Sequence, residues 1–418
     1  MRVLLIDFNP FTPPVTPISL GNLGAVLRVL GHQVEILSLG STSRFSLRDL
    51  QGYLEEHDPR LVGFGAYQRN ISQVRAVARM VKGIVPDASV VIGGPQATFL
   101  PDAAIEGMLE VDHVSRGEGE LAIKAIVEAI DGGTEHLPIP GVSSRTADGE
   151  VVTGPPVEPV ADLDSYPSPW LTGVLDPTEM DESIMLTSRG CPHQCCFCHT
   201  PSAFGRRVRR QSVERVLEDI AWVSRAGTGR LWFADPNFSF SKKRVVAILE
   251  GIIERGLKVS MWVETRADML GADLIGLMRR AGVDSVALGL ESASPKVYPG
   301  LNKGLAPEKI GWAARAALSA GLDVELFSQY ALPGETLDDA LQTLKFVKDC
   351  GVPIRGNSNA QQMQLYFGSE VHTNYQSYGI RPLREVFPPH LAIGTEFETE
   401  WMSRDEIRQV KNAWLAES

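Results

Sequence analysis

The first half of this chain alternates short apolar runs with amphipathic segments. Five runs rich in β-branched and aliphatic residues are expected to be strands, at residues 2–6, 34–37, 61–65, 89–93 and 112–115. Segments of helical periodicity separate them, which is typical of a parallel sheet covered by helices on both faces. The pattern predicts a Rossmann-like, doubly wound parallel sheet over residues 1–135. Such a sheet binds its ligand at the carboxyl ends of its strands.

The loop after the first expected strand argues against a dinucleotide as that ligand. It reads Asp7-Phe-Asn-Pro-Phe-Thr-Pro-Pro14 and lacks the GxGxxG pattern. Dinucleotide sites need those glycines where a helix N-terminus approaches pyrophosphate. We therefore expect a bulkier ligand.

The alternation of short apolar runs with amphipathic segments begins again after residue 183. Six more strands are expected, at residues 184–187, 231–234, 259–263, 285–290, 324–330 and 362–366. Caps at Ser212 and Thr336, and Pro307 in a first helical turn, mark the helices between them. Six units predict a partial (β/α)6 TIM-type barrel over residues 183–368, with its chemistry at the C-terminal ends of the strands.

The remaining segments are expected to connect or extend these two domains. Residues 136–182 are rich in proline, glycine and acidic residues, so we interpret them as a linker. Residues 369–418 form a short C-terminal extension, in which Ser403 and Glu406 make a capping box before a helix.

The charge and hydropathy of the sequence argue against nucleic acid and membrane as partners. The 418 residues carry 51 acids against 40 bases, a net charge of −11, and the longest basic patch is at residues 205–210. Nucleic acid is an unfavourable partner for such a chain, because phosphate contacts need a concentrated basic surface. No apolar run of about 18 residues occurs, so we expect neither a membrane span nor a secretory signal, and a cytoplasmic location.

Three cysteines with a CxxxCxxC spacing lie just after the first expected barrel strand. Cys191, Cys195 and Cys198 can hold three irons of a [4Fe–4S] cluster and leave the fourth iron open to a small ligand. Zinc is the alternative, with His193, Cys196 or His199 as fourth ligand, but structural zinc sites usually pair two separated CxxC halves. A cluster is favoured.

This motif resembles the radical S-adenosylmethionine (SAM) enzymes, in which the open iron binds SAM. The resemblance implies SAM contacts from Phe197 beside Cys198 and from His199. It also implies contacts from Asp235 or Asn237, which stand where the family usually has glycines that receive the SAM amino group.

Two further strand ends resemble the segments that hold the ribose and carboxylate of SAM. They contain Glu264 and Arg266 in one, and Glu291 in the other. A carboxylate such as Glu291 suits a ribose diol, and Arg266 suits a carboxylate as a bidentate donor. For each residue the alternative is an ordinary buried ion pair or helix cap. Polar residues at strand ends are the candidates for a substrate pocket: Glu264, Tyr330, Gln361 and Tyr366.

The first half resembles the cobalamin-binding domain that precedes the radical core in one large subgroup. Asn9 stands where other cobalamin proteins have a cobalt-ligating histidine, so the resemblance implies cobalamin bound base-off without a histidine ligand. Loops at the strand ends are implied to surround the corrin and its tail; one of the residues Tyr67, Gln68 and Arg69 would cover the lower face of cobalt. The implied contacts are Asn9, Pro10, Tyr67, Gln68, Arg69, Gly93, Gly94, Pro95, Gln96, Gly117, Glu118 and Gly119.

The two resemblances together imply a cobalamin-dependent radical SAM methyltransferase. Such an enzyme would move a methyl group from SAM through methylcobalamin to a weakly activated carbon of a small-molecule or natural-product substrate, using a 5′-deoxyadenosyl radical. An electron donor such as flavodoxin or ferredoxin would be its partner. A cyclase or rearrangement enzyme with the same cofactors is an alternative, and a non-catalytic cobalamin or iron–sulfur sensor is another.

Overall fold

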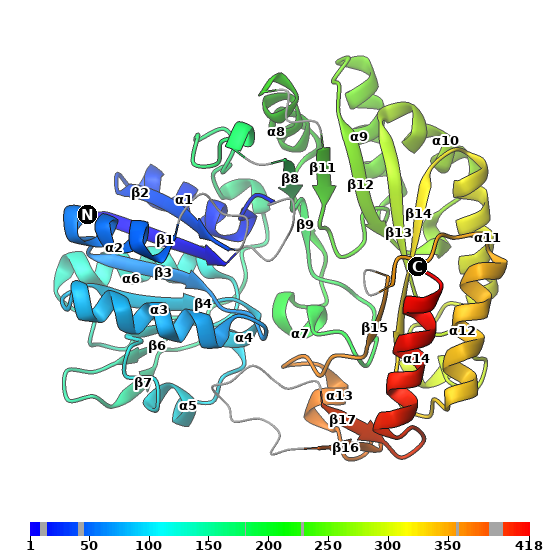
Figure 1. Ribbon diagram of the computed structural model, residues 1–418. Helices are drawn as coiled ribbons and strands as arrows, with labels where there is room; N and C mark the ends of the chain where they lie inside the picture. The colour runs from blue at the N-terminus through cyan, green and yellow to red at the C-terminus, as the bar shows by residue number, and fades with distance from the viewer. Residues whose placement is uncertain (9–14, 41–45, 180, 227–229, 357–358, 384–395) are drawn as a thin grey trace. The chain divides into compact units, whose positions relative to one another are not determined.

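The computed structural model of the chain divides into two compact units, and their main boundary falls between Ile184 and Met185. The structure describes all residues except 9–14, 41–45, 180, 227–229, 357–358 and 384–395. Each unit has its own central sheet (Figure 1).

The first unit contains a seven-stranded mixed sheet in the order β2-β1-β3-β4-β5-β6-β7. Its strands are β1 (Arg2–Phe8), β2 (Gln33–Leu39), β3 (Leu61–Gly65), β4 (Ser89–Gly93), β5 (His113–Ser115), β6 (Val142–Arg145) and β7 (Val151–Thr153). Neighbours among the first five strands are paired in parallel, whereas β6 and β7 pair antiparallel. The expected doubly wound sheet is therefore confirmed and is extended at one edge.

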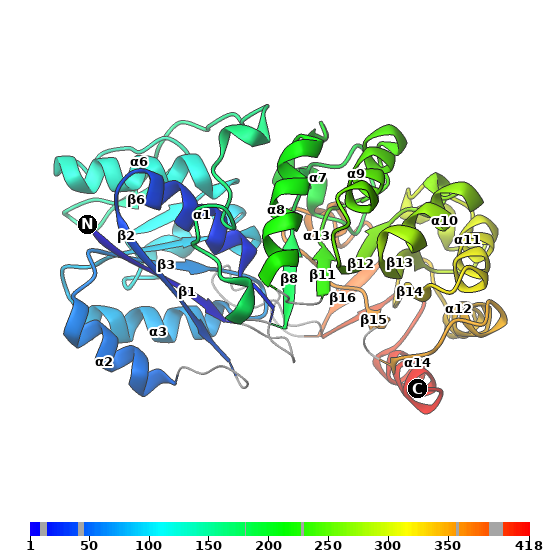
Figure 2. The ribbon, with the colours of Figure 1, turned by 90° about the horizontal axis from the view of Figure 1, so that it is seen from above.

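Helices cover both faces of this sheet (Figure 2). They are α1 (Ile18–Val29), α2 (Leu47–His57), α3 (Ile71–Ile84), α4 (Pro95–Thr98), α5 (Asp102–Glu106) and α6 (Gly119–Gly132). On one face α1 and α6 pack against Val3 and Leu5 of β1, and on the other α2 and α3 pack against Leu4 and Ile6. Successive residues of β1 thus enter two separate cores, as expected for a strand buried on both faces.

The predicted linker contains structure that the sequence analysis did not anticipate. Both β6 and β7 lie within residues 136–182, together with the 3-10 turns η1 (Leu163–Ser165) and η2 (Pro177–Glu179). β6 reads Val-Ser-Ser-Arg, which is too short and polar to give a strand signal. It is held by its antiparallel register with β5, where Val114 faces Ser143.

The second sheet has six strands in the order β15-β14-β13-β12-β11-β8. They are β8 (Glu182–Met185), β11 (Arg230–Phe233), β12 (Ser260–Thr265), β13 (Val283–Glu291), β14 (Asp323–Tyr330) and β15 (Ala360–Gln362). The last strand begins and ends earlier than the expected 362–366, because Ser328, Gln329 and Tyr330 of β14 pair with Ala360, Gln361 and Gln362. The curled parallel sheet confirms the expected partial barrel.

Helices line one side of this sheet, and burial along the strands follows that arrangement. The helices are α8 (Val213–Ala226), α9 (Lys242–Glu254), α10 (Ala272–Ala281), α11 (Pro307–Ser319) and α12 (Leu337–Asp349). In β12 and β14 alternate residues are buried, while those between them are only partly buried. One sheet face is thus packed under the helices, and the other is partly open.

The remaining elements are short, apart from the last helix. They are β9 (Ser188–Arg189), β10 (Arg209–Arg210), α7 (Thr200–Phe204), η3 (Ala267–Met269), η4 (Tyr298–Leu301), α13 (Glu370–Thr373), β16 (Ile380–Pro382), β17 (Phe397–Thr399) and α14 (Arg404–Ala416). The predicted capping box of Ser403 and Glu406 begins α14. Within the described residues, no helix has the length and apolar character needed to cross a membrane.

Candidate active site

The cysteine segment is a loop whose two ends are tied together. Ser188 and Arg189 of β9 pair antiparallel with Arg210 and Arg209 of β10. Gly190 lies between this ladder and the first cysteine with φ +90°, and a Cβ atom there would come within 2.4 Å of the Arg207 carbonyl oxygen. The loop therefore needs glycine at this position, for both backbone angle and space.

The four clustered cysteines differ in exposure. Cys191, Cys195 and Cys198 are partly exposed, whereas Cys196 is buried. The backbone of Cys196 is fixed on both sides, because its N–H donates to the Leu301 carbonyl at 3.1 Å and its carbonyl accepts from the Val371 N–H at 3.0 Å. The three CxxxCxxC thiols are thus the accessible ones, and the extra thiol belongs to the protein core.

These thiols fit an iron–sulfur cluster. Among the described residues, no three His, Cys, Asp or Glu side chains converge on one metal ion. A cluster does not require such convergence, because each cysteine binds a different iron. Burial raises the pKa of Cys195 to about 11, while the positive charges of Lys303 and Arg266 act in the opposite direction. The same charges would favour the thiolates that ligate iron.

Three polar side chains, those of Glu291, Lys303 and Gln329, form a hydrogen-bonded group at the C-terminal ends of β13 and β14. Lys303 Nζ donates to Glu291 Oε1 at 2.7 Å and to the Gly289 carbonyl at 2.6 Å. The second carboxylate oxygen, Glu291 Oε2, accepts from Gln329 Nε2 at 2.7 Å. The carboxylate predicted to meet the SAM ribose is therefore held by residues from two other segments.

The backbone of β13 is distorted at Glu291, where this group forms. Glu291 has φ +67°, which is costly for a residue with a side chain, and the β13–β14 register shifts between Gly289 and Glu291. A Cβ at Gly289 would lie 2.5 Å from Lys303 Nζ. Glycine thus makes room for the ammonium group, and the bulge turns Glu291 toward it.

The neighbouring strand end, at β12, contributes Arg266. Its guanidinium is paired with Asp268, with Nε 3.2 Å from Oδ1 and Nη2 3.1 Å from Oδ2, and Nη2 also donates to the Lys303 carbonyl at 3.1 Å. Asn237 Oδ1 accepts from Thr265 Oγ1 and from the Arg266 N–H. The Asn237 side chain is buried, and its Nδ2 has no hydrogen-bond partner among the described residues. An orphaned donor at this sheet edge fits an acceptor on a bound ligand.

Asp235 is occupied within the protein. Its Oδ1 accepts from the N–H groups of Thr187 and Ser188 at 2.6 and 2.9 Å, and its Oδ2 accepts from Thr187 Oγ1 at 2.6 Å. The carboxylate is fully buried, and burial raises its pKa. Asp235 therefore connects the end of β11 to the strand that leads into the cysteine loop.

Among the expected pocket residues, Glu264 has the most perturbed environment. Burial raises its pKa to about 7, a hydrogen bond with Trp232 opposes that shift, and the charge of Glu325 adds to it. Glu264 lies on the partly open face of β12. Glu325 on β14 accepts from Trp262 Nε1 at 2.9 Å.

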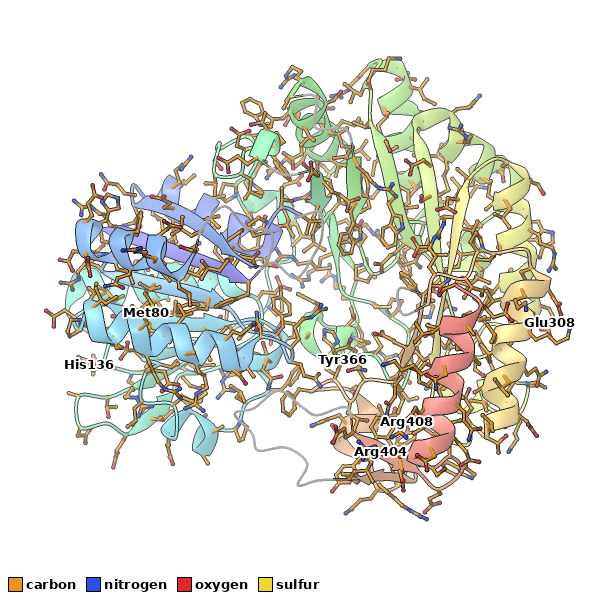
Figure 3. The ribbon with its side chains drawn as sticks, viewed as in Figure 1. Met80, His136, Glu308, Tyr366, Arg404 and Arg408 are labelled. Carbon is orange, nitrogen blue, oxygen red and sulfur yellow. The ribbon has the colours of Figure 1, made fainter. Side chains whose placement is uncertain are left out.

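The other expected pocket residues do not share one face. Tyr330 is buried with Leu326 and Ser328, on the face of β14 opposite Gln329, whereas Gln361 is exposed. The Tyr366 ring lies 5.3 Å from the His199 ring, in the loop beside α7 (Figure 3). Burial lowers the pKa of His199. Phe197 is half-buried between the second and third cysteines.

The first unit presents loops at the carboxyl ends of β3, β4 and β5. Asn70 fixes the first of them, because its Oδ1 accepts from the Tyr67 N–H at 2.7 Å and its Nδ2 donates to the Gly65 carbonyl at 2.9 Å. Gly94 has φ +105°, and a Cβ there would lie 3.0 Å from the Ala66 carbonyl oxygen. Gly117 has φ +79° with open space around it. These glycines leave backbone accessible to a large planar ligand.

Unpartnered polar atoms lie at this same edge. Both side-chain amide atoms of Gln68 and the hydroxyl of Ser115 are buried without a hydrogen-bond partner among the described residues. Tyr67 and Arg69, on either side of Gln68, are exposed. Buried polar atoms rarely stay unpaired, so this edge fits a ligand with polar groups, as cobalamin has.

The structure places the remaining cobalamin candidates around these loops. Gly93 packs against Ser115, and Gln96 is buried. Pro95 begins α4, and Glu118 precedes Gly119 at the start of α6. Asn9 and Pro10 lie outside the described residues.

The sequence analysis missed Lys303 and Gln329, which hold Glu291. A signal for Lys303 was present, since it stands between Leu301 and Leu305 in an apolar segment where a lysine needs a partner. Gln329 gave no such signal, because only the register of β14 against β13 decides which of its residues faces Glu291.

Known proteins match both units. Residues 185–347 match the Radical SAM superfamily, and residues 7–127 match the B12 binding domain. The two sites thus define an enzyme that combines a radical SAM core with a cobalamin domain.

Two individual relatives are similar to this chain over most of its length. The chain is 32% identical over 337 residues to the "Uncharacterized methyltransferase PH0819" of Pyrococcus horikoshii, covering 79% of this chain and 73% of that protein. It is 27% identical over 368 residues to an anaerobic magnesium-protoporphyrin IX monomethyl ester cyclase of Rubrivivax gelatinosus, covering 84% of this chain and 66% of that protein.

A solved structure agrees in fold. The radical S-adenosylmethionine methyltransferase TsrM of Kitasatospora setae, with cobalamin and a [4Fe–4S] cluster bound, superposes with a TM-score of 0.77 at 19% identity, covering 99% of this chain and 90% of that one. With both family matches and the 32% identity to the Pyrococcus horikoshii protein, the chain belongs to the family of cobalamin-dependent radical SAM methyltransferases.

Proposed function

We propose that this enzyme transfers a methyl group from SAM to a weakly activated carbon of a small-molecule or natural-product substrate. When bound, the cluster supplies a SAM-derived radical and cobalamin supplies methyl-transfer chemistry. The chain's own task is to hold both cofactors and the substrate in a fixed, dry arrangement. The observation that carries the proposal is the Glu291–Lys303–Gln329 group, because it holds a carboxylate in place at the strand end where the family resemblance puts the SAM ribose.

The proposed cofactor contacts follow from the geometry described above. Cys191, Cys195 and Cys198 would hold the cluster. SAM would meet Glu291 and the free Nδ2 of Asn237, together with Lys303. In the first unit, Gln68 and the glycine loops support a cobalamin site. Residues 66–70 contain no histidine, which supports cobalamin bound without a histidine ligand, and we propose that it is bound base-off.

Two further features of the proposal concern its surroundings. Cysteines gathered for a cluster, rather than paired in disulfides, suit a reducing cytoplasmic compartment. Reduction of the cluster needs a one-electron donor, for which flavodoxin or ferredoxin is the natural class of partner.

Cluster-loaded, reduced protein tests the first half of this proposal. With SAM it should release 5′-deoxyadenosine, and Cys195→Ala should abolish that release. The matched control is Cys196→Ala, which removes the neighbouring buried thiol and should keep the activity. If both variants behave alike, the assignment of the cluster ligands is wrong.

A cyclase remains the second candidate, because the Rubrivivax gelatinosus relative covers 84% of this chain. Product mass separates the two candidates. A gain of one CH₂ supports methyl transfer, whereas loss of hydrogen or an unchanged mass supports ring formation or rearrangement.

A further inference from the structure

Glu335 is a fully buried carboxyl group in the turn between β14 and α12. Its Oε2 accepts from the Leu332 N–H at 3.2 Å, and its Oε1 accepts from Ser292 Oγ at 3.4 Å. One side chain therefore bridges the segments that follow β13 and β14.

Both bridged segments begin with a strained residue. Glu291, just before Ser292, has φ +67°, and Ala331, just before Leu332, has φ +59°. Such conformations persist in residues with side chains only when their surroundings hold them. Glu335 contacts the neighbour of each strained residue, so it is placed to maintain both.

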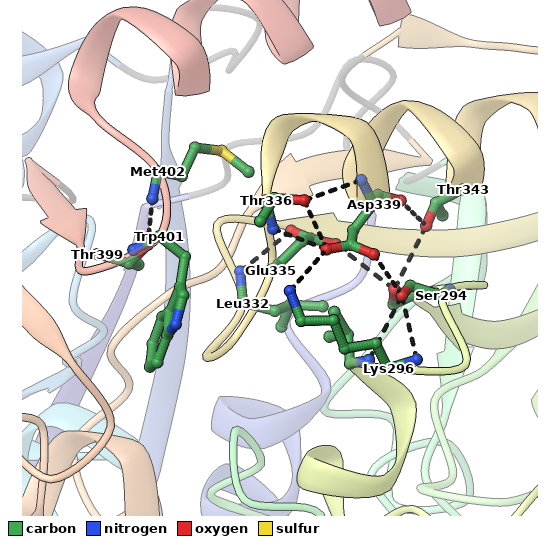
Figure 4. A network of polar contacts seen from close by, with 12 residues as sticks. Ser294, Lys296, Leu332, Glu335, Thr336, Asp339, Thr343, Thr399, Trp401 and Met402 are labelled. Atoms are coloured by element: carbon green, nitrogen blue, oxygen red, sulfur yellow. Dashed lines mark hydrogen bonds and ion pairs between the residues drawn. The ribbon is translucent and has the colours of Figure 1, made fainter.

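The bridge belongs to a larger polar network (Figure 4). Thr343 Oγ1 of α12 accepts from the Ala293 N–H at 2.9 Å, and Ser294 Oγ donates to Asp339 Oδ1 at 2.7 Å. Asp339 and Thr336 form the capping box of α12. The loop after Glu291 is thus attached to the start of α12 as well as to Glu335.

We propose that Glu335 is a positioning residue that holds the strained end of β13, and through it the Glu291–Lys303–Gln329 group, in the geometry that binds SAM. This inference rests on the SAM site proposed above. Glu335 acts through Ser292 and the backbone, and it touches neither SAM nor the cluster cysteines.

The protonation state of Glu335 determines which substitution preserves its hydrogen bonds. Burial raises its pKa to about 8, the hydrogen bonds from Leu332, Ala331 and Ser292 oppose the shift, and the charge of Asp339 adds to it. The group is therefore mostly neutral near pH 7. A glutamine has the same shape and can make equivalent hydrogen bonds, whereas an alanine cannot.

The test measures the affinity for SAM of the full-length, cluster-loaded protein, from the change in the EPR spectrum of the reduced cluster as SAM is added. Glu335→Ala and Ser292→Ala should weaken binding by about tenfold, on the scale of one or two lost hydrogen bonds. Glu335→Gln should stay within about twofold of the wild type. Thr336→Ala is the matched control, because it removes the cap of α12 in the same turn but leaves the bonds of Glu335 to Ser292 and Leu332 in place.

The outcomes are distinct. The proposal is supported if Thr336→Ala lowers the melting temperature without changing SAM affinity, while Ser292→Ala lowers the affinity. It is overturned if the Glu335 and Ser292 variants bind SAM as the wild type does, if Glu335→Gln fails as Glu335→Ala does, or if Thr336→Ala weakens binding equally. A wild-type spectrum that does not respond to SAM would instead reject the SAM site itself, and this inference with it.

Discussion

Lys303 Nζ lies 2.7 Å from Glu291 Oε1, and both side chains are buried at the ends of the barrel strands. A buried ion pair gains little over an apolar replacement of both partners, but removing one partner leaves a charge without compensation. Burying this ion pair therefore adds little to the free energy of unfolding, which is consistent with a role in binding a ligand rather than in stability.

Lys303→Met is expected to lower the free energy of unfolding by about 3–5 kcal/mol in the absence of ligands. Lys296→Met is the control, because Lys296 lies 3.6 Å from Asp339 but its side chain is 61% exposed. That variant should lose less than about 1 kcal/mol. Urea denaturation of both proteins measures the difference, and equal losses would show that the Lys303 pair is not buried as described.

Gly190→Ala is expected to prevent cluster assembly. The change combines an unfavourable φ of +90° with a Cβ that lies 2.4 Å from the Arg207 carbonyl. The control is Gly256→Ala, in the same unit but outside the cysteine loop, because Gly256 also has a positive φ of +63° and nothing lies within 4 Å of a Cβ built there. Iron and sulfide content after reconstitution should fall for the first variant and remain near the wild type for the second. Similar iron content in both would mean that the loop tolerates a side chain at Gly190.

Gln68→Leu is expected to weaken cobalamin binding without destabilising the apoprotein. The amide of Gln68 is buried without a partner, so an apolar side chain costs the apoprotein little and removes hydrogen bonds only from the complex. We expect a loss of affinity of about tenfold, with an unchanged or higher melting temperature. Titration with hydroxocobalamin, followed by absorbance, measures the affinity. The exposed neighbour Arg69 provides the comparison as Arg69→Ala, and a larger loss there would assign the contact to Arg69.

Glu264 is expected to make stability depend on pH. Its pKa rises from 4.5 to about 7 on folding, so the folded state binds the proton more tightly than the unfolded state. The stabilisation is complete below pH 4.5 and is lost as the pH rises through 7. The stability of the wild type relative to Glu264→Gln should therefore fall by on the order of 2–3 kcal/mol over this window. Chemical denaturation at several pH values measures this difference, and a constant difference would contradict the raised pKa.

Most strands of both sheets could be predicted from the sequence, because they are short runs rich in apolar residues. The expected bounds of β3 and β4 agree with the structure to the residue. The cysteine ligands could be proposed because their spacing is local. By contrast, β6 and β7 depend on pairing at a sheet edge, and a four-residue strand such as Val142–Arg145 has no pattern of its own.

The polar site was harder to predict, since it depends on contacts between distant segments. Tyr330, the candidate taken from the sequence, and Gln329 lie on opposite faces of β14, and it is Gln329 that contacts Glu291. The bulge at Glu291 changes parity within β13 itself, and no local sequence pattern reports it. Asp235 could be placed at a strand end, but not its three hydrogen bonds to Thr187 and Ser188.

The transfer of a labelled methyl group tests the central claim most directly. Protein loaded with cluster and cobalamin would be reduced and supplied with SAM bearing a deuterated methyl group and with candidate substrates. The account predicts that a product gains the deuterated methyl group and that 5′-deoxyadenosine and S-adenosylhomocysteine are both formed. A product that forms with 5′-deoxyadenosine but carries no label would contradict methyl transfer and favour a cyclase or rearrangement enzyme.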